Sequence, residues 1–231
     1  MTRNILLLSS GLVHPSLLLR RRIRRLLTET IRGEGDRSAP PLEVTSRLSR
    51  LAGLDPDHTA AVVLLYHRKK LPPGALEGLS SFLRRGGGAL AIHAALASFK
   101  DDPGYAELLG SPFRGHDAPG LIRVLPAVSR STAGGTAGAP DSAPAPESPI
   151  PREGVVVRDE LYRVSLREDA SVLAEGHLGS GEVQPVCWER SVGEGRVAVV
   201  TLGHYARTYR VSFLRRLIQD ELRRLSGRPV A

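Results

Sequence analysis

The chain has 231 residues, of which 41% are hydrophobic and only 4% aromatic, so Leu, Val and Ala must supply most of the core of one α/β domain. Its single cysteine, Cys187, excludes an internal disulfide and a cysteine-rich metal site. The net charge of +8 comes mainly from arginines scattered along the chain. Because no motif that reads bases accompanies this charge, we expect no nucleic-acid partner.

The apolar runs are short. The longest, such as Ile5–Leu8 and Ala60–Tyr66, fall far below the ~20 residues of a membrane span. His14 and Pro15 interrupt the apolar N-terminus, and no cleavage site of small residues follows. We therefore expect no membrane span, no signal peptide and a cytoplasmic location.

The first half of the chain alternates strand and helix patterns. We predict strands at Asn4–Ser9, Leu42–Ser46, Ala60–Tyr66 and Ala89–Ile92, and helices at Ser16–Arg32 and Pro72–Arg85. This alternation predicts an α/β fold with a doubly wound, mostly parallel sheet and helices on both faces, as in flavodoxin. The arginine-rich face of Ser16–Arg32 suits the solvated outside of such a fold better than a membrane surface.

The second half is less regular. The chain is irregular from His93 through Phe113, and a strand pattern follows at Leu121–Leu125. Residues at about 127–153 are rich in Ser, Ala, Gly and Pro, which predicts a flexible insert. Strand patterns then resume at Ser171–Ala174, Val183–Glu189 and Arg196–Leu202. A final helix is predicted at Ser212–Leu225. We therefore assign residues 1–231 to a single domain.

His93 ends a buried strand and is followed by Ala94 and Ala95. Small residues around a polar one at this place are typical of the nucleophile elbow, a tight strand-to-helix turn above the carboxyl edge of a sheet. Ligands of open α/β sheets bind at that edge. The plainer interpretation is a core histidine bonded to a backbone carbonyl. Cys187 lies within a strand without elbow glycines, so cysteine-dependent acyl transfer is not expected.

Four ordered motifs resemble the ThuA (trehalose utilisation) family. They are the region from Leu71 through His116, the D-E-L-Y element within Val157–Val164, the L-G-H-x-x-x-T-Y turn within Pro185–Tyr209, and His14 after the first strand. In the Gly110–His116 element of the first motif, Ser111 stands where the family usually has Gly. The resemblance implies a fold like class I glutamine amidotransferases, with His93 in place of their cysteine. It also implies a role in catabolism of trehalose and 3-keto-disaccharides, and a homodimer. The family often has His-Pro-Ile before D-E-L-Y; here Ser148 replaces the histidine.

These motifs give the candidate site. We assign catalytic roles to His93, Glu160 and Tyr162, and substrate binding to His14, His116, Asp159 and His204. His93, His116 and His204 could hold a divalent metal such as Zn²⁺, although no diagnostic ligand spacing is present. Without a metal, His93 would act as a general base with Glu160 as its partner. His58, His67 and His177 are expected to be ordinary polar positions.

Three functions are consistent with these residues. The first is a lyase or hydrolase that acts on a keto-sugar. The second is a non-catalytic module that binds a sugar or a protein, because the change at Ser148 and the insert place catalysis in doubt. The third is a basic surface that binds nucleic acid or an anionic membrane through Ser16–Arg32; it would require strongly salt-dependent binding.

Overall fold

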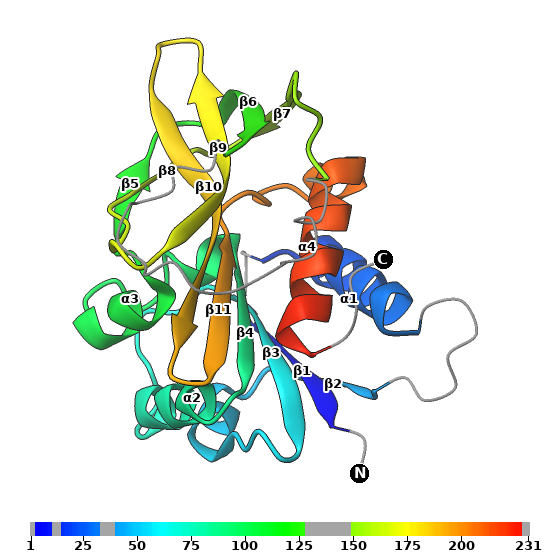
Figure 1. The fold of residues 1–231 in the computed structure, drawn as a ribbon, viewed down its shortest axis with the longest axis vertical. Helices are drawn as coiled ribbons and strands as arrows, with labels where there is room; N and C mark the ends of the chain where they lie inside the picture. Colours follow the sequence, from blue (N-terminus) through cyan, green and yellow to red (C-terminus); the bar gives the residue numbers. More distant parts are fainter. Residues whose placement is uncertain (1–2, 11–14, 33–39, 128–148, 228–231) are drawn as a thin grey trace, which may run out of the picture.

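The computed structural model describes residues 3–10, 15–32, 40–127 and 149–227. Its main feature is a nine-stranded sheet in the order β2-β1-β3-β4-β11-β10-β9-β6-β7 (Figure 1). The strands are β1 (Asn4–Ser10), β2 (Leu42–Thr45), β3 (Thr59–Tyr66), β4 (Gly88–Ile92), β6 (Gly120–Pro126), β7 (Val155–Asp159), β9 (Ser171–Leu178), β10 (Val183–Val192) and β11 (Gly195–Val200). In a separate two-stranded sheet, β5 (Phe113–His116) pairs with β8 (Tyr162–Val164).

The large sheet is mixed, which corrects the prediction of a mostly parallel one. Strands β2, β1, β3, β4 and β11 run parallel. From β11 onward, β10, β9, β6 and β7 pair antiparallel with their neighbours. The chain turns directly from β10 into β11 at Gly193 and Glu194, and a connection this short can join only antiparallel strands. The α/β class is confirmed.

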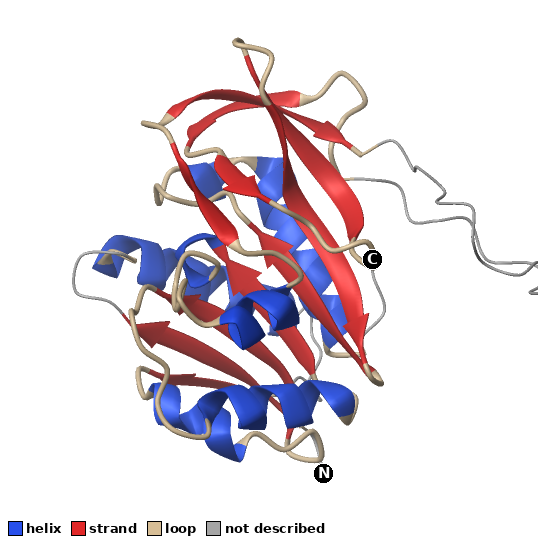
Figure 2. Ribbon diagram, turned by 90° about the vertical axis from the view of Figure 1, so that its left-hand side faces the viewer, coloured by secondary structure: helices blue, strands red, loops and turns tan. Residues whose placement is uncertain are grey.

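Helices cover both faces of the parallel half (Figures 1 and 2). On one face, α1 (Leu17–Arg32) and α4 (Ser212–Leu225) pack into a core with Ile5, Leu7 and Val63. On the other, α2 (Ala75–Arg84) and α3 (Pro103–Leu109) pack with Leu6, Leu8 and Val62. Consecutive residues of β1 and β3 enter opposite cores, which is why Ile5–Leu8 and Ala60–Leu65 are continuous apolar runs.

The local predictions differ from the structure at three places. Helix α2 begins at Ala75 because Gly74, which follows two prolines, has a left-handed φ of 72° and ends the non-helical segment. Helix α3 and strand β5 occupy the stretch expected to be irregular. Strands β7 and β8 follow the expected insert. Of that insert, residues 128–148 lie outside the described ranges. Within those ranges no helix is long and apolar enough to cross a membrane.

Candidate active site

The turn predicted at His93 is present. Strand β4 ends at Ile92, and a single 3-10 turn, η2 (His93–Ala95), follows it. His93 has a φ of 47°, which is uncommon for a residue with a side chain and places the buried ring above the sheet edge. Its Nδ1 lies 2.6 Å from the Thr201 carbonyl oxygen, so Nδ1 carries the proton and donates it to that oxygen. This leaves Nε2 as the acceptor nitrogen.

Glu160 is the common neighbour of three histidines. Its Oε2 lies 3.5 Å from His93 Nε2 and 3.7 Å from His116 Nε2, and its Oε1 lies 3.2 Å from His204 Nδ1. The Glu160 side chain is only 9% exposed, so these contacts are poorly screened by water. The three histidines come from the end of β4, the end of β5 and the loop after β11, and β7 ends just before Glu160. The fold therefore gathers the predicted site residues around one carboxylate.

Tyr162 forms the aromatic side of this cluster. Its hydroxyl lies 3.0 Å from His93 Nε2 and donates to it. Burial and the neighbouring carboxylates of Glu160 and Asp159 raise the pKa of Tyr162, so the phenol keeps its proton at neutral pH. In the antiparallel pair of β5 and β8, His116 lies opposite Tyr162, and their rings stack with centroids 5.4 Å apart. Hence His116 ends a strand and does not lie in a loop.

Asp159, for which we predicted substrate binding, is held within a network of hydrogen bonds. It is fully buried and does not line the cavity. Its Oδ1 accepts from the backbone N–H groups of Glu160 (2.9 Å) and His204 (3.0 Å), and its Oδ2 accepts from Gly203 N (3.2 Å) and Thr208 Oγ1 (2.7 Å). Desolvation raises the pKa of Asp159, while these four hydrogen bonds lower it. Asp159 thus fixes the loop that carries His204.

The group of donor atoms that could hold a metal contains Glu160 in place of the predicted His116. Among the described residues, nitrogen atoms of His93 and His204 and an oxygen of Glu160 all lie within 4.8 Å of one another. His116 is left out because its ring lies beyond Glu160 and its Nδ1 contacts the Asp117 carbonyl at 2.9 Å. Two imidazoles and one carboxylate are a usual donor set for Zn²⁺ and related divalent ions. The hydrogen bond from His93 Nδ1 to a carbonyl is also the usual support of a metal-binding histidine.

The cluster forms part of a cavity of about 630 Å³. His93, His116, Glu160, Tyr162 and His204 line it. His67, which we expected to be an ordinary polar position, also lines it, as do Arg68, Lys69, Phe99, Lys100 and Phe113. The rule that identified His93 applies equally to His67–Lys69, because they follow the buried strand β3 at the same carboxyl edge. Lys100 lies in no regular strand or helix pattern and gave no such signal, whereas Phe113 lies within the Gly110–His116 element.

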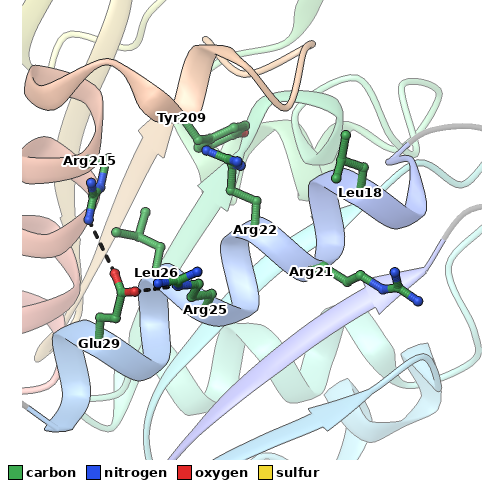
Figure 3. A pocket seen from close by; sticks show the side chains of 8 residues that line it. All are labelled: Leu18, Arg21, Arg22, Arg25, Leu26, Glu29, Tyr209 and Arg215. Atoms are coloured by element: carbon green, nitrogen blue, oxygen red, sulfur yellow. Dashed lines mark hydrogen bonds and ion pairs between the residues drawn. The ribbon is translucent and has the colours of Figure 1, made fainter.

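A second hollow, of about 290 Å³, lies between α1 and the start of α4 (Figure 3). Arg25 and Arg215 there both pair with Glu29, at 2.7 and 3.3 Å. Leu18, Arg21, Arg22, Leu26 and Tyr209 complete its lining. It holds no histidine and no second carboxylate, so it offers no acid–base pair. The candidate active site is therefore the cavity at His93.

The remaining predicted positions lie elsewhere. His14 and Ser148 fall outside the described residues. His58 is exposed and contacts Asp55 at 2.9 Å, and His177 lies on β9 near Glu175, so neither belongs to the site. Cys187 is fully buried in β10, and burial raises the pKa of its thiol. A buried protonated thiol cannot serve as the nucleophile of an amidotransferase.

Comparison with known proteins identifies the family of the chain. The family model ThuA, described as trehalose utilisation, matches residues 28–222. The chain belongs to the ThuA family. No protein with a curated description matches it.

Solved structures share the fold. A protein described as ThuA-like from Bacteroides uniformis superposes with a TM-score of 0.71 over 97% of this chain and 91% of its own, at 15% identity. A second from Parabacteroides merdae gives a TM-score of 0.68 over 100% and 92%, again at 15% identity. A β-galactosidase from Bacillus circulans gives 0.62 over 99% of this chain but only 32% of its own, at 15% identity. At such identities the likeness extends to the fold alone.

Proposed function

We propose that this ThuA-family protein is a metal-assisted lyase or hydrolase that acts on a keto-sugar. The observation that carries the proposal is the convergence of His93, Glu160 and His204 donor atoms in a cavity of about 630 Å³. A cavity of this size suits a sugar or small disaccharide. The family description, trehalose utilisation, supports a carbohydrate as the substrate.

His93, Glu160 and His204 would hold the ion, which when bound would polarise a carbonyl oxygen as a Lewis acid. Thr201 orients the His93 ring through its carbonyl oxygen, and Asp159 orients the His204 backbone. Tyr162 supplies a hydroxyl that can donate to the keto oxygen as negative charge develops there. His116, beside Glu160 and 35% exposed, is the base nearest to this group of ligands.

The reaction that fits these groups is an elimination. A ketone at C3 of the sugar acidifies the C2–H bond, and a base such as His116 removes that proton. The electron pair left at C2 forms the C1=C2 double bond while the bond from C1 to the glycosidic oxygen breaks. The leaving oxygen takes a proton and departs as an alcohol, which is glucose if the substrate is 3-keto-trehalose. The atoms balance without an oxidant or a reductant.

A metal-free version uses the same cluster differently. The 3.0 Å contact between the Tyr162 hydroxyl and His93 Nε2 suits a proton relay in which His93 is the base. Glu160 would then stabilise the charged imidazole from 3.5 Å away. Removing metal distinguishes the versions: chelation abolishes turnover in the first and leaves it unchanged in the second.

The test is release of glucose from 3-keto-trehalose by the full chain, with Zn²⁺ or Mn²⁺ supplied. We expect turnover by the wild type and by the control His58→Ala, whose histidine is exposed and far from the site. We expect His93→Ala to lose about 100-fold or more. Equal turnover by His93→Ala would refute the mechanism. If the folded wild type binds the sugar but releases nothing, the protein is the non-catalytic module.

A further inference from the structure

One wall of the active-site cavity carries positive charge. Arg68 and Lys69 follow β3 directly, Lys100 follows the η2 segment, and all three are exposed and line the cavity. The three lysines of the chain are Lys69, Lys70 and Lys100, all other cationic side chains being arginine. A chain that otherwise uses arginine thus has two of its three ammonium groups, those of Lys69 and Lys100, in the lining of this cavity.

The fold holds these cations beside the cluster. Arg68 N donates to Ser98 Oγ at 3.1 Å, and Phe99 N donates to the Arg68 carbonyl at 3.0 Å, which ties the two cationic segments together. In the sheet, β4 lies between β3 and β11. The cationic segment after β3 and the His204 loop after β11 therefore flank His93 from two sides. A ligand that reaches the cluster also meets the cations.

The three side chains are not used for the stability of the fold. Within the described ranges Arg68, Lys69 and Lys100 make no salt bridge, whereas many of the arginines on the helices and on β8–β10 do. The acidic residue that lines the cavity near them, Asp101, is exposed. Three cations against the two carboxylates of Asp101 and Glu160 leave an excess of positive charge, which attracts an anion into a cleft.

We infer that the substrate carries an anionic group, a phosphate or a carboxylate, that Arg68, Lys69 and Lys100 bind while its sugar ring lies against the His93–Glu160–His204 cluster. A guanidinium and two ammonium groups are the donors that recognise either anion. The inference rests on the proposed function, because it specifies the substrate class of that same site. It narrows the preferred substrate to keto-sugars that also carry a phosphate or a carboxylate, with neutral keto-sugars as weaker ligands.

Titration calorimetry on the zinc-supplied full chain tests this with glucose, glucose 6-phosphate and glucuronate. We expect one of the two anionic sugars to bind about tenfold or more tightly than glucose, with an advantage that shrinks as salt is raised. Which of the two binds better identifies the anion. Arg68→Gln with Lys100→Gln should abolish the advantage, while the control Arg21→Gln with Arg24→Gln, on exposed positions of α1, should keep it.

Equal binding of all three sugars, or no binding of either anion, would overturn the inference. So would an anion advantage that survives in the Arg68/Lys100 variant, because the anion would then be held by the metal cluster. Failure of the proposed function is recognised separately. If zinc does not bind but the anionic sugars still bind through Arg68 and Lys100, the metal proposal fails and this inference stands.

Discussion

Asp159 is a buried carboxylate that supports the loop carrying His204. Four donors converge on it, and two of them belong to the backbone of Gly203 and His204. We predict that Asp159→Asn lowers the free energy of unfolding by about 2–4 kcal/mol, because the amide nitrogen would face N–H or O–H donors and leave them unsatisfied. Urea denaturation measures this. The exposed Asp57→Asn is the control and should be near neutral.

Tyr162 contributes to chemistry more than to stability. Its hydroxyl donates to His93 Nε2, and its ring packs between His93 and His116. Tyr162→Phe keeps the ring and removes only the hydroxyl, so we predict a fall in kcat of about 10- to 100-fold with a stability change of about 1 kcal/mol. Turnover and thermal unfolding of the same sample separate the two effects. Unchanged kcat would remove Tyr162 from the catalytic groups.

At the scale of elements, the loop after β11 depends on Gly203. Its φ is 127°, and a Cβ built there would overlap the Tyr209 hydroxyl, which donates to the Gly203 carbonyl at 3.2 Å. We predict that Gly203→Ala costs about 3 kcal/mol or more and displaces His204 from Glu160. The control Gly179→Ala, which has open space around its Cα, should change stability little. Native stability in Gly203→Ala would contradict this role of the loop.

Helix α4 contains a buried acid that makes stability depend on pH. Desolvation raises the pKa of Glu221 to about 7. The cations of Arg224 and Arg196 lower this pKa, and the carboxylates of Glu189 and Asp220 raise it further. The folded protein therefore keeps a proton on Glu221 that the unfolded chain releases above its ordinary pKa of 4.5. Stability from this group is present below pH 4.5 and falls as pH rises to about 7, by up to about 3 kcal/mol.

Glu221→Gln provides the measurement. Between pH 4.5 and 7 the wild type should lose stability relative to the variant, whose amide does not titrate. Denaturation at several pH values gives the difference between the two proteins, which cancels the other titrating groups. A difference that stays constant with pH would show that Glu221 is ionised in the folded state throughout.

The elements that could be predicted from sequence are those with strong periodicity. Strand β1, helix α1 and helix α4 appear within one residue of their predicted bounds, because a buried strand or an amphipathic helix leaves a clear pattern. Strands β5, β7 and β8 were missed. They are short, and the partners that stabilise them come from distant parts of the chain, such as the His116–Tyr162 pairing. Antiparallel pairing from β11 to β7 likewise depends on contacts that single-strand patterns do not encode.

Across the whole molecule, the sequence located the cluster better than the cavity. His93, Glu160, Tyr162, His116 and His204 converge as their motifs implied, because each lies near a strand end at one sheet edge. The cationic wall was missed, because exposed basic residues resemble an ordinary solvated surface until the fold places them around a cavity. The burial of Asp159 was missed because three of its four hydrogen-bond partners lie 44 or more residues away.

The most direct test of the proposed centre is the stoichiometry and affinity of Zn²⁺ for the whole chain, measured by calorimetry with a metal-content analysis. We predict about one ion per chain for the wild type and for His58→Ala, with about 100-fold weaker binding in Glu160→Gln and His204→Ala. His116→Ala should stay within about tenfold of the wild type, because His116 lies outside the set of converging donor atoms. Absence of zinc binding, or wild-type affinity in both Glu160→Gln and His204→Ala, would contradict the account.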